Sequence, residues 1–99
     1  MNLAEIFNIP TGKFDIFIRK VEISSYIPGR VRLYSKELIN NEPLKEKILN
    51  VLNLPELDRV VINTVSGSIL ITYDPATLRR NGELKKVEDY IMTHARRKQ

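Results

Sequence analysis

The chain has 99 residues, which is enough for one domain with a modest core, and its 42% hydrophobic content fits a folded globule. It contains no cysteine, and this excludes disulfides, thiolate metal sites, iron–sulfur clusters and a cysteine nucleophile. The 16 basic and 12 acidic residues give a formal net charge of +4, which is moderate for a nucleic-acid-binding protein. The sequence has neither a signal-peptide pattern nor an apolar run of about 20 residues, so we expect a cytoplasmic protein without membrane insertion.

We expect residues 1–12 to be an N-terminal extension and residues 13–99 to form a single domain. The segment 14–25 is predicted to be a strand, because apolar and polar residues alternate along it. The parity of this alternation changes near Arg19 and Lys20. A β-bulge at that point would insert one residue and return both halves to the same face of a sheet.

A β-hairpin is predicted next, because Pro28-Gly29 is the strongest turn signal in the chain. Residues 30–35 alternate cleanly and form its second strand. A helix follows, since Asn40 and Asn41 are both plausible N-caps and Pro43 suits the first turn. Its apolar residues recur at helical spacing, namely Leu44, Ile48, Val51 and Leu52.

The second half of the chain repeats this order of hairpin and helix. Residues 59–64 and 68–73 are rich in β-branched and apolar side chains, and Ser66-Gly67 supplies the turn between them. A second helix is predicted after residue 82. One face of this helix carries Leu84, Val87, Ile91 and His94.

Three segments resemble heavy-metal-associated domains. Leu54–Val60 is similar to the Leu-Pro-Gly-Val sequence that precedes the second strand of the family, and Ser66–Pro75 is similar to its turn and third strand, which end in Tyr-Asp-Pro. Ile27–Leu33 is similar to a divergent branch in which a Pro-Gly-Arg-(Ile/Val)-Arg motif replaces the Cys-x-x-Cys metal motif. Domains of that branch occur alone or at the cytoplasmic N-termini of metal-transporting P-type ATPases. The resemblance covers about residues 30–75.

The resemblance implies an α+β, ferredoxin-like sandwich, with a four-stranded antiparallel sheet and two helices on one face. Only a helix follows Tyr73 in this chain, so the fourth strand of the family is missing from its usual place. A strand joined to the first by a tight hairpin must also lie antiparallel beside it. We therefore predict that residues 14–25, in the N-terminal hairpin, supply the edge strand.

The metal chemistry of the family does not transfer to this chain. The loop that carries the two cysteines in metal-binding relatives corresponds to residues 35–42, which contain no cysteine or histidine. Glu37, Glu42 and His94 are the candidates that remain for a metal site, although helix capping explains Glu42 and packing explains His94. No nucleophile elbow or phosphate-binding glycine loop is present, so we expect neither a catalytic site nor a cofactor.

A binding surface is predicted instead. Strand alternation places Arg30, Arg32 and Tyr34 on the sheet face opposite the helices, and Arg19 and Lys20 add positive charge nearby. We expect a non-catalytic interaction module linked to metal transport or homeostasis. Its partner would be a protein, such as a metal-transporting P-type ATPase or a second copy in a dimer. The alternative is a basic ferredoxin-like domain that binds nucleic acid, although the paired stacking aromatics of RNA-recognition motifs are absent.

Overall fold

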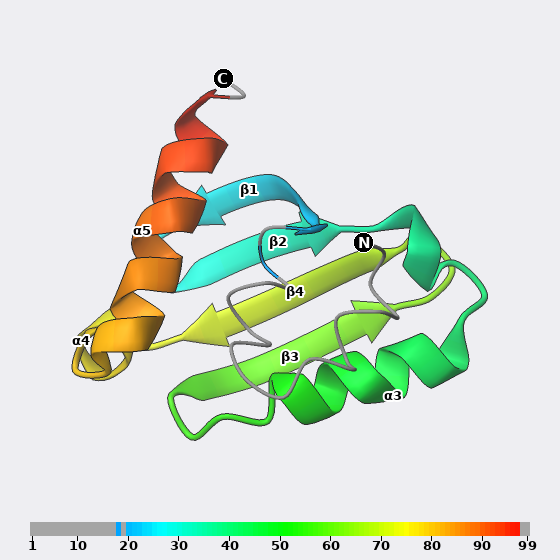
Figure 1. The fold of residues 1–99 in the computed structure, drawn as a ribbon, viewed down its shortest axis with the longest axis horizontal. Coiled ribbons are helices and arrows are strands. Elements are labelled where there is room, and N and C mark those ends of the chain that lie inside the picture. Colours follow the sequence, from blue (N-terminus) through cyan, green and yellow to red (C-terminus); the bar gives the residue numbers. More distant parts are fainter. Residues whose placement is uncertain (1–17, 19, 98–99) are drawn as a thin grey trace.

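The computed structural model describes residues 18 and 20–97 (Figure 1). In chain order, its elements are β1 (Glu22–Ile27), β2 (Arg30–Tyr34), the 3-10 turn η1 (Lys36–Leu38), α3 (Glu42–Val51), β3 (Leu57–Asn63), β4 (Ser68–Tyr73), α4 (Pro75–Arg79) and α5 (Gly82–Arg97). No helix in this part of the chain combines the length and the apolar composition needed to cross a bilayer.

The four strands form one antiparallel sheet in the order β1-β2-β4-β3. This arrangement confirms the α+β, ferredoxin-like class. The N-terminal hairpin turns at Pro28-Gly29, where Gly29 has φ +90°, and it places β1 at the sheet edge beside β2. The edge position that the family's fourth strand occupies is therefore filled by β1, as the sequence predicted.

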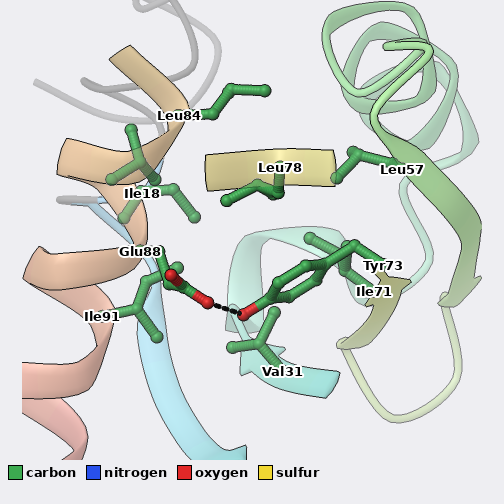
Figure 2. A pocket seen from close by; sticks show the side chains of 10 residues that line it. Ile18, Val31, Leu57, Ile71, Tyr73, Leu78, Leu84, Glu88 and Ile91 are labelled. Atoms are coloured by element: carbon green, nitrogen blue, oxygen red, sulfur yellow. Dashed lines mark hydrogen bonds between the residues drawn. The ribbon is translucent and has the colours of Figure 1, made fainter. Parts of the chain in front are cut away.

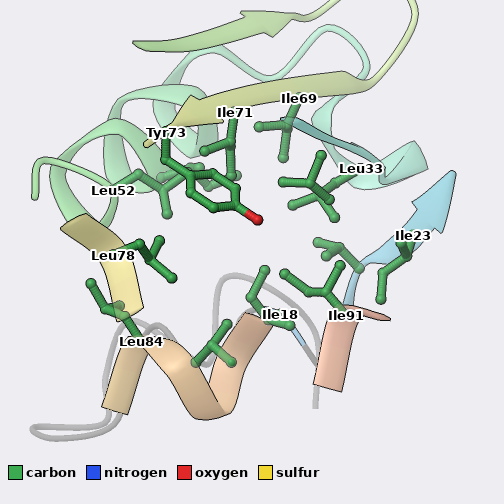
Figure 3. Close-up of a cluster of buried hydrophobic side chains, with 14 of the residues drawn as sticks. Ile18, Ile23, Leu33, Leu52, Ile69, Ile71, Tyr73, Leu78, Leu84 and Ile91 are labelled. Carbon is green, nitrogen blue, oxygen red and sulfur yellow. The ribbon is translucent and has the colours of Figure 1, made fainter. Parts of the chain in front are cut away.

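The core lies between the helices and the sheet face that they cover (Figure 3). Alternate residues of the central strands point into it, because successive side chains of a strand point to opposite faces. The sheet contributes Ile23, Val31, Leu33, Ile69, Ile71 and Tyr73. The helices and the C-cap of α3 contribute Leu44, Ile48, Leu52, Leu78, Leu84, Val87 and Ile91. The two helical faces predicted from the sequence are confirmed in the main, although Val51 and His94 are only half-buried.

The predicted strand over 14–25 is wrong in its position. The strand starts at Glu22 and continues to Ile27, while Ile18 and Lys20 are helical and the rest of 14–19 lies outside the described residues. Ile18 and Val21 are both buried, and a spacing of three residues suits a helical turn that leads into a strand. The predicted bulge at Arg19-Lys20 falls partly outside the described residues, because Arg19 is not among them.

A bulge does occur in β1, between Ile23 and Ser25. It shifts the register by one residue, so Tyr26 points into the core side of the sheet while Ser25 and Ile27 point to the other face. The short helix α4 was not predicted. It begins directly at Pro75, a residue whose fixed φ suits the first helical position.

Candidate functional site

The sheet face opposite the helices, which we call the open face, is built from three rows of side chains that lie side by side across the strands. The register of the sheet defines them as Ile27, Arg30, Thr72 and Arg59 in the first row, Ser25, Arg32, Leu70 and Val61 in the second, and Glu22, Tyr34, Ser68 and Asn63 in the third. The first two rows hold three arginines among aliphatic side chains.

These arginines are exposed, and within the described part of the chain none of them forms a salt bridge. Arg30 and Arg59 flank Thr72 from the two neighbouring strands, and Arg32 follows two residues after Arg30 on the same face. The apolar neighbours are exposed as well, since Ile27 keeps 60% and Val61 keeps 41% of its surface in contact with solvent. The open face is therefore both basic and apolar.

A hollow open to solvent lies at the β1–β2 end of this face. It is lined by Ser25, Tyr26, Ile27, Arg30 and Arg32. The bulge in β1 contributes to it, because the shifted register brings the Ser25 side chain beside Arg32 and the Ile27 side chain beside Arg30. The hollow thus combines two guanidinium groups, a hydroxyl and an aliphatic side chain.

The other residues predicted for this surface lie differently. Tyr34 is on the open face but is half-buried, and its ring lies against the β3–β4 turn, where a Cβ added at Gly67 would be 3.2 Å from its Cε1 atom. Lys20 is exposed but precedes β1, and Arg19 lies outside the described residues. Arg59 was missed, although alternation along 59–64 places it on the same parity as Val61, opposite to the half-buried Val60 and Ile62.

The loop 35–42, which corresponds to the family's metal loop, is held by hydrogen bonds between its polar side chains and the backbone. Ser35 Oγ accepts a hydrogen bond from the Glu37 amide at 3.2 Å. The side chain of Asn41 accepts from the Leu44 amide at 3.1 Å and donates to the Glu37 carbonyl at 3.2 Å, so of the two predicted candidates, Asn40 and Asn41, it is Asn41 that caps α3. Its polar groups therefore serve the entry into the helix.

The metal candidates are not brought together. Glu42 accepts a hydrogen bond from Thr64 at 3.0 Å and lies 3.8 Å from the Lys45 ammonium. His94 belongs to α5, a helix on the other side of the molecule from η1 (Figure 1). Its Nδ1 lies 2.8 Å from the Tyr90 carbonyl oxygen, and its ring stacks on the Tyr90 ring. Across residues 18 and 20–97, no three His, Asp or Glu side chains converge as a metal site would require.

A buried carboxylate is the strongest polar feature of the interior. Glu88 of α5 is 3% exposed and accepts hydrogen bonds from three elements, of which Figure 2 shows the bond from Tyr73. Tyr73 of β4 donates at 2.6 Å, Tyr26 of β1 donates at 3.1 Å, and Arg79 of α4 donates through Nε at 2.8 Å. Glu88 was not predicted from the sequence as a buried residue. It follows Leu84 by four residues and so lies on the inward face of the helix.

The electrostatics of this cluster follow from its contacts. Burial alone would raise the pKa of Glu88, but the hydrogen bonds from Arg79, Tyr73 and Tyr26 outweigh burial, so the pKa of this carboxyl lies below its ordinary value. Burial and the hydrogen bond to Glu88 raise the pKa of the Tyr73 phenol. Both groups therefore keep their ordinary charge at neutral pH, with Glu88 ionised and Tyr73 protonated.

A small apolar cavity lies beside Glu88 and Tyr73 (Figure 2). Its wall is otherwise aliphatic, and it consists of Ile18, Val31, Leu57, Ile71, Leu78, Leu84, Val87 and Ile91. The two polar side chains of the wall bond to each other. The cavity is thus a part of the core that offers no unused polar group to a ligand.

The geometry of the open face and of the Glu88 cluster does not identify a protein family, but a comparison with known families does. The family described as heavy metal associated domain 2 matches residues 11–92, which is most of the chain. The chain belongs to this family. The resemblance seen in the sequence is confirmed, and so is the link to heavy-metal-associated domains that lack the thiolate pair. Comparisons with curated proteins and with solved structures found no match.

Proposed function

We propose that this heavy metal associated domain is a non-catalytic interaction module that serves metal transport or homeostasis in the cytoplasm without binding the metal through thiolates. In this proposal the domain begins near residue 13, after an extension formed by residues 1–12. The observation that carries the function is the open face, where Arg30, Arg32 and Arg59 lie among Ile27, Leu70 and Val61 and form no salt bridge with any residue that the structure describes. Arginine and apolar side chains together are typical of protein interfaces.

The composition of the loop 35–42 supports the same proposal. Its side chains cap α3 and close the turn, and no cysteine or histidine is available to hold a soft metal ion. A domain of this family that keeps its fold while lacking these ligands retains its surfaces as the means to act. We therefore assign it an accessory or regulatory role, exercised through a protein partner such as a metal-transporting P-type ATPase or through self-association.

The second candidate is a nucleic-acid-binding domain, which the net charge of +4 and the exposed arginines favour. Single-stranded nucleic acids are bound by aromatic rings that stack on successive bases. On the described part of the open face the aromatic residue is Tyr34, and its ring is half-buried against Gly67. Aliphatic neighbours of the arginines suit a protein partner better than bases.

The test uses the cytoplasmic domains of the metal-transporting P-type ATPase of the same organism. Titrated into the ¹⁵N-labelled full chain, they are expected to shift amide resonances of β2, β4 and Ile27. The variant Ile27→Ser should weaken this binding, while Val65→Ser should leave it unchanged, because Val65 is 82% exposed in the β3–β4 turn and lies outside the open face. Equal weakening by both variants, or no binding at all, would contradict this partner.

A parallel titration addresses the metal. Cu(I), Zn²⁺ and Mn²⁺ are expected to leave the amide resonances of residues 35–42 in place, because Glu42 and Asn41 are engaged in hydrogen bonds that hold the loop. Saturable shifts confined to this loop with any of these ions would show that the loop is a metal site after all. Binding of the transporter domains with no response to metal would support the accessory role.

A further inference from the structure

We propose that the hollow, with the two arginines that line it, recognises an extended acidic segment of a protein partner, with carboxylates two residues apart and aliphatic side chains on the same side. This inference rests on the proposed function, since it names the chemistry of the partner that the open face takes. The proposed ligand of the open face is thus a protein segment and not a nucleic acid.

The spacing of the two arginines favours an extended peptide segment. Arg30 and Arg32 lie on one strand with one residue between them, and both point to the open face. Two residues of an antiparallel strand span about 7 Å. Side chains at positions i and i+2 of an extended peptide have the same separation and direction, so their carboxylates match the two guanidinium groups in register. Helical peptides present neighbours at i+3 and i+4, which do not fit this spacing.

The surroundings of the two arginines favour a segment that also carries aliphatic side chains. Ile27 lies beside Arg30 across the β1–β2 pair, and Leu70 lies beside Arg32 across the β2–β4 pair. Ile27 is 60% exposed, and Val61 continues the aliphatic surface from Leu70 to β3. A segment that carried carboxylates alone would leave this surface in water. Aliphatic side chains two residues before and after the carboxylates, on the same side, would cover it.

The positive charges of the open face favour an acidic partner. Within the residues that the structure describes, Arg30, Arg32 and Arg59 have no salt-bridge partner, so no carboxylate of that part of the chain holds their guanidinium groups. Arg59 lies two strands from Arg30, about 10 Å away at the usual strand spacing. It extends the positive field over the apolar surface, and it favours acidic over neutral partners as they approach.

The experiment compares two synthetic peptides of equal composition, each about ten residues long. One has glutamates at i and i+2 with leucines at i−2 and i+4, and the other has the glutamates at i and i+1, on opposite sides of the extended chain. We expect the first to bind the full chain up to about fivefold more tightly, because the second offers one carboxylate where the first offers two and one exposed ion pair is worth up to about 1 kcal/mol. Amide shifts should be confined to β2, Ile27 and Leu70.

Matched variants test the two guanidinium groups. The double variant Arg30→Gln/Arg32→Gln should remove the preference between the peptides, whereas Arg80→Gln/Lys47→Gln removes the same charge from exposed positions off the open face and should keep it. A single-stranded oligonucleotide of about 15 nucleotides is the competing probe. It should leave the resonances of the open face unshifted at physiological salt.

The inference is overturned if the two peptides bind equally, if neither binds, or if the oligonucleotide shifts the open-face resonances and the peptides do not. Each of these results is separate from the proposed function. If the transporter domains bound the wild type and Val65→Ser more tightly than Ile27→Ser, the open face would still be a protein interface. This conclusion would hold even if the spacing of the carboxylates had no effect on binding.

Discussion

Glu88 joins parts of the chain that are far apart in sequence. Its carboxylate accepts hydrogen bonds from the N-terminal strand, the last strand and the short helix α4. A buried charge is tolerated only where it is paired and hydrogen-bonded, and here one guanidinium and two phenols supply the partners. The cluster therefore ties β1, the strand that fills the edge of the sheet, to α5 on the core side.

The pH dependence of stability should report this cluster. Because the pKa of Glu88 is lower in the folded chain than its ordinary value of 4.5, its contribution is complete above pH 4.5 and is lost as the pH falls through the lower, folded value. We expect Glu88→Gln to reduce the free energy of unfolding by about 1–3 kcal/mol at pH 7. The difference between wild type and variant should shrink in acid, as measured by urea denaturation between pH 7 and pH 3.

The control for this prediction is Glu83→Gln, an exposed position in the first turn of the same helix. Its effect on the free energy of unfolding should be within about 0.5 kcal/mol, as for most surface substitutions. A Glu88→Gln variant whose deficit stayed constant from pH 7 to pH 3 would show that the ionised carboxylate does not stabilise the fold.

At the scale of the elements, β1 behaves as a full strand of the sheet. Ile23 is 4% exposed and packs into the common core, although it comes from a segment that precedes the part of the chain in which the sequence motifs lie. We expect Ile23→Ala to lower the free energy of unfolding by about 2–5 kcal/mol, because it deletes buried methyl groups and leaves a cavity. Urea denaturation measures this change.

The matched control for β1 is Ser24→Ala, at the exposed residue of the bulge. It should change the free energy of unfolding by no more than about 0.5 kcal/mol. If Ile23→Ala were as mild as this control, β1 would be a loosely attached segment, and the sheet would depend on three strands.

The turn between β3 and β4 fixes the position of the loop 35–42. Gly67 has φ +80°, and a Cβ at this residue would lie 2.6 Å from the Ser35 carbonyl oxygen. We expect Gly67→Ala to destabilise the protein by about 2 kcal/mol or more, since it adds backbone strain to a steric clash. Gly82→Ala is the control, because nothing lies within 4 Å of its added Cβ; it should be neutral or stabilising by up to about 1 kcal/mol. Thermal unfolding distinguishes the two.

The sequence predicted those elements whose signals are local. Pro28-Gly29 and Ser66-Gly67 marked the two hairpins, and Asn41 marked the start of α3, because turns and caps depend on the residues that form them. The start of β1 was predicted at the wrong place. Ile18 is helical, and its burial depends on contacts with the rest of the core. The open face followed from alternation at Arg30 and Arg32. The Glu88 cluster could not be predicted, because its four residues meet only after the sheet and helices have packed.

The whole molecule carries a net charge of +4, and three arginines of one sheet face contribute to it. Two copies that met through their open faces would bring two sets of Arg30, Arg32 and Arg59 into one interface. Like charges across an interface oppose association, while an acidic partner is attracted by the same field. Self-association and binding of an acidic partner therefore depend on salt in opposite ways.

We accordingly expect any dimer formed through the open face to become stronger as salt rises from about 0.01 M to about 1 M, over which the Debye length falls from roughly 30 Å to roughly 3 Å. At low salt, the triple variant Arg30→Gln/Arg32→Gln/Arg59→Gln should dimerise more than the wild type, because it keeps Ile27, Leu70 and Val61 and loses the repulsion. Light scattering coupled to size-exclusion chromatography measures both effects. A dimer that weakened with salt, or that the triple substitution left unchanged, would have to use a surface other than the open face.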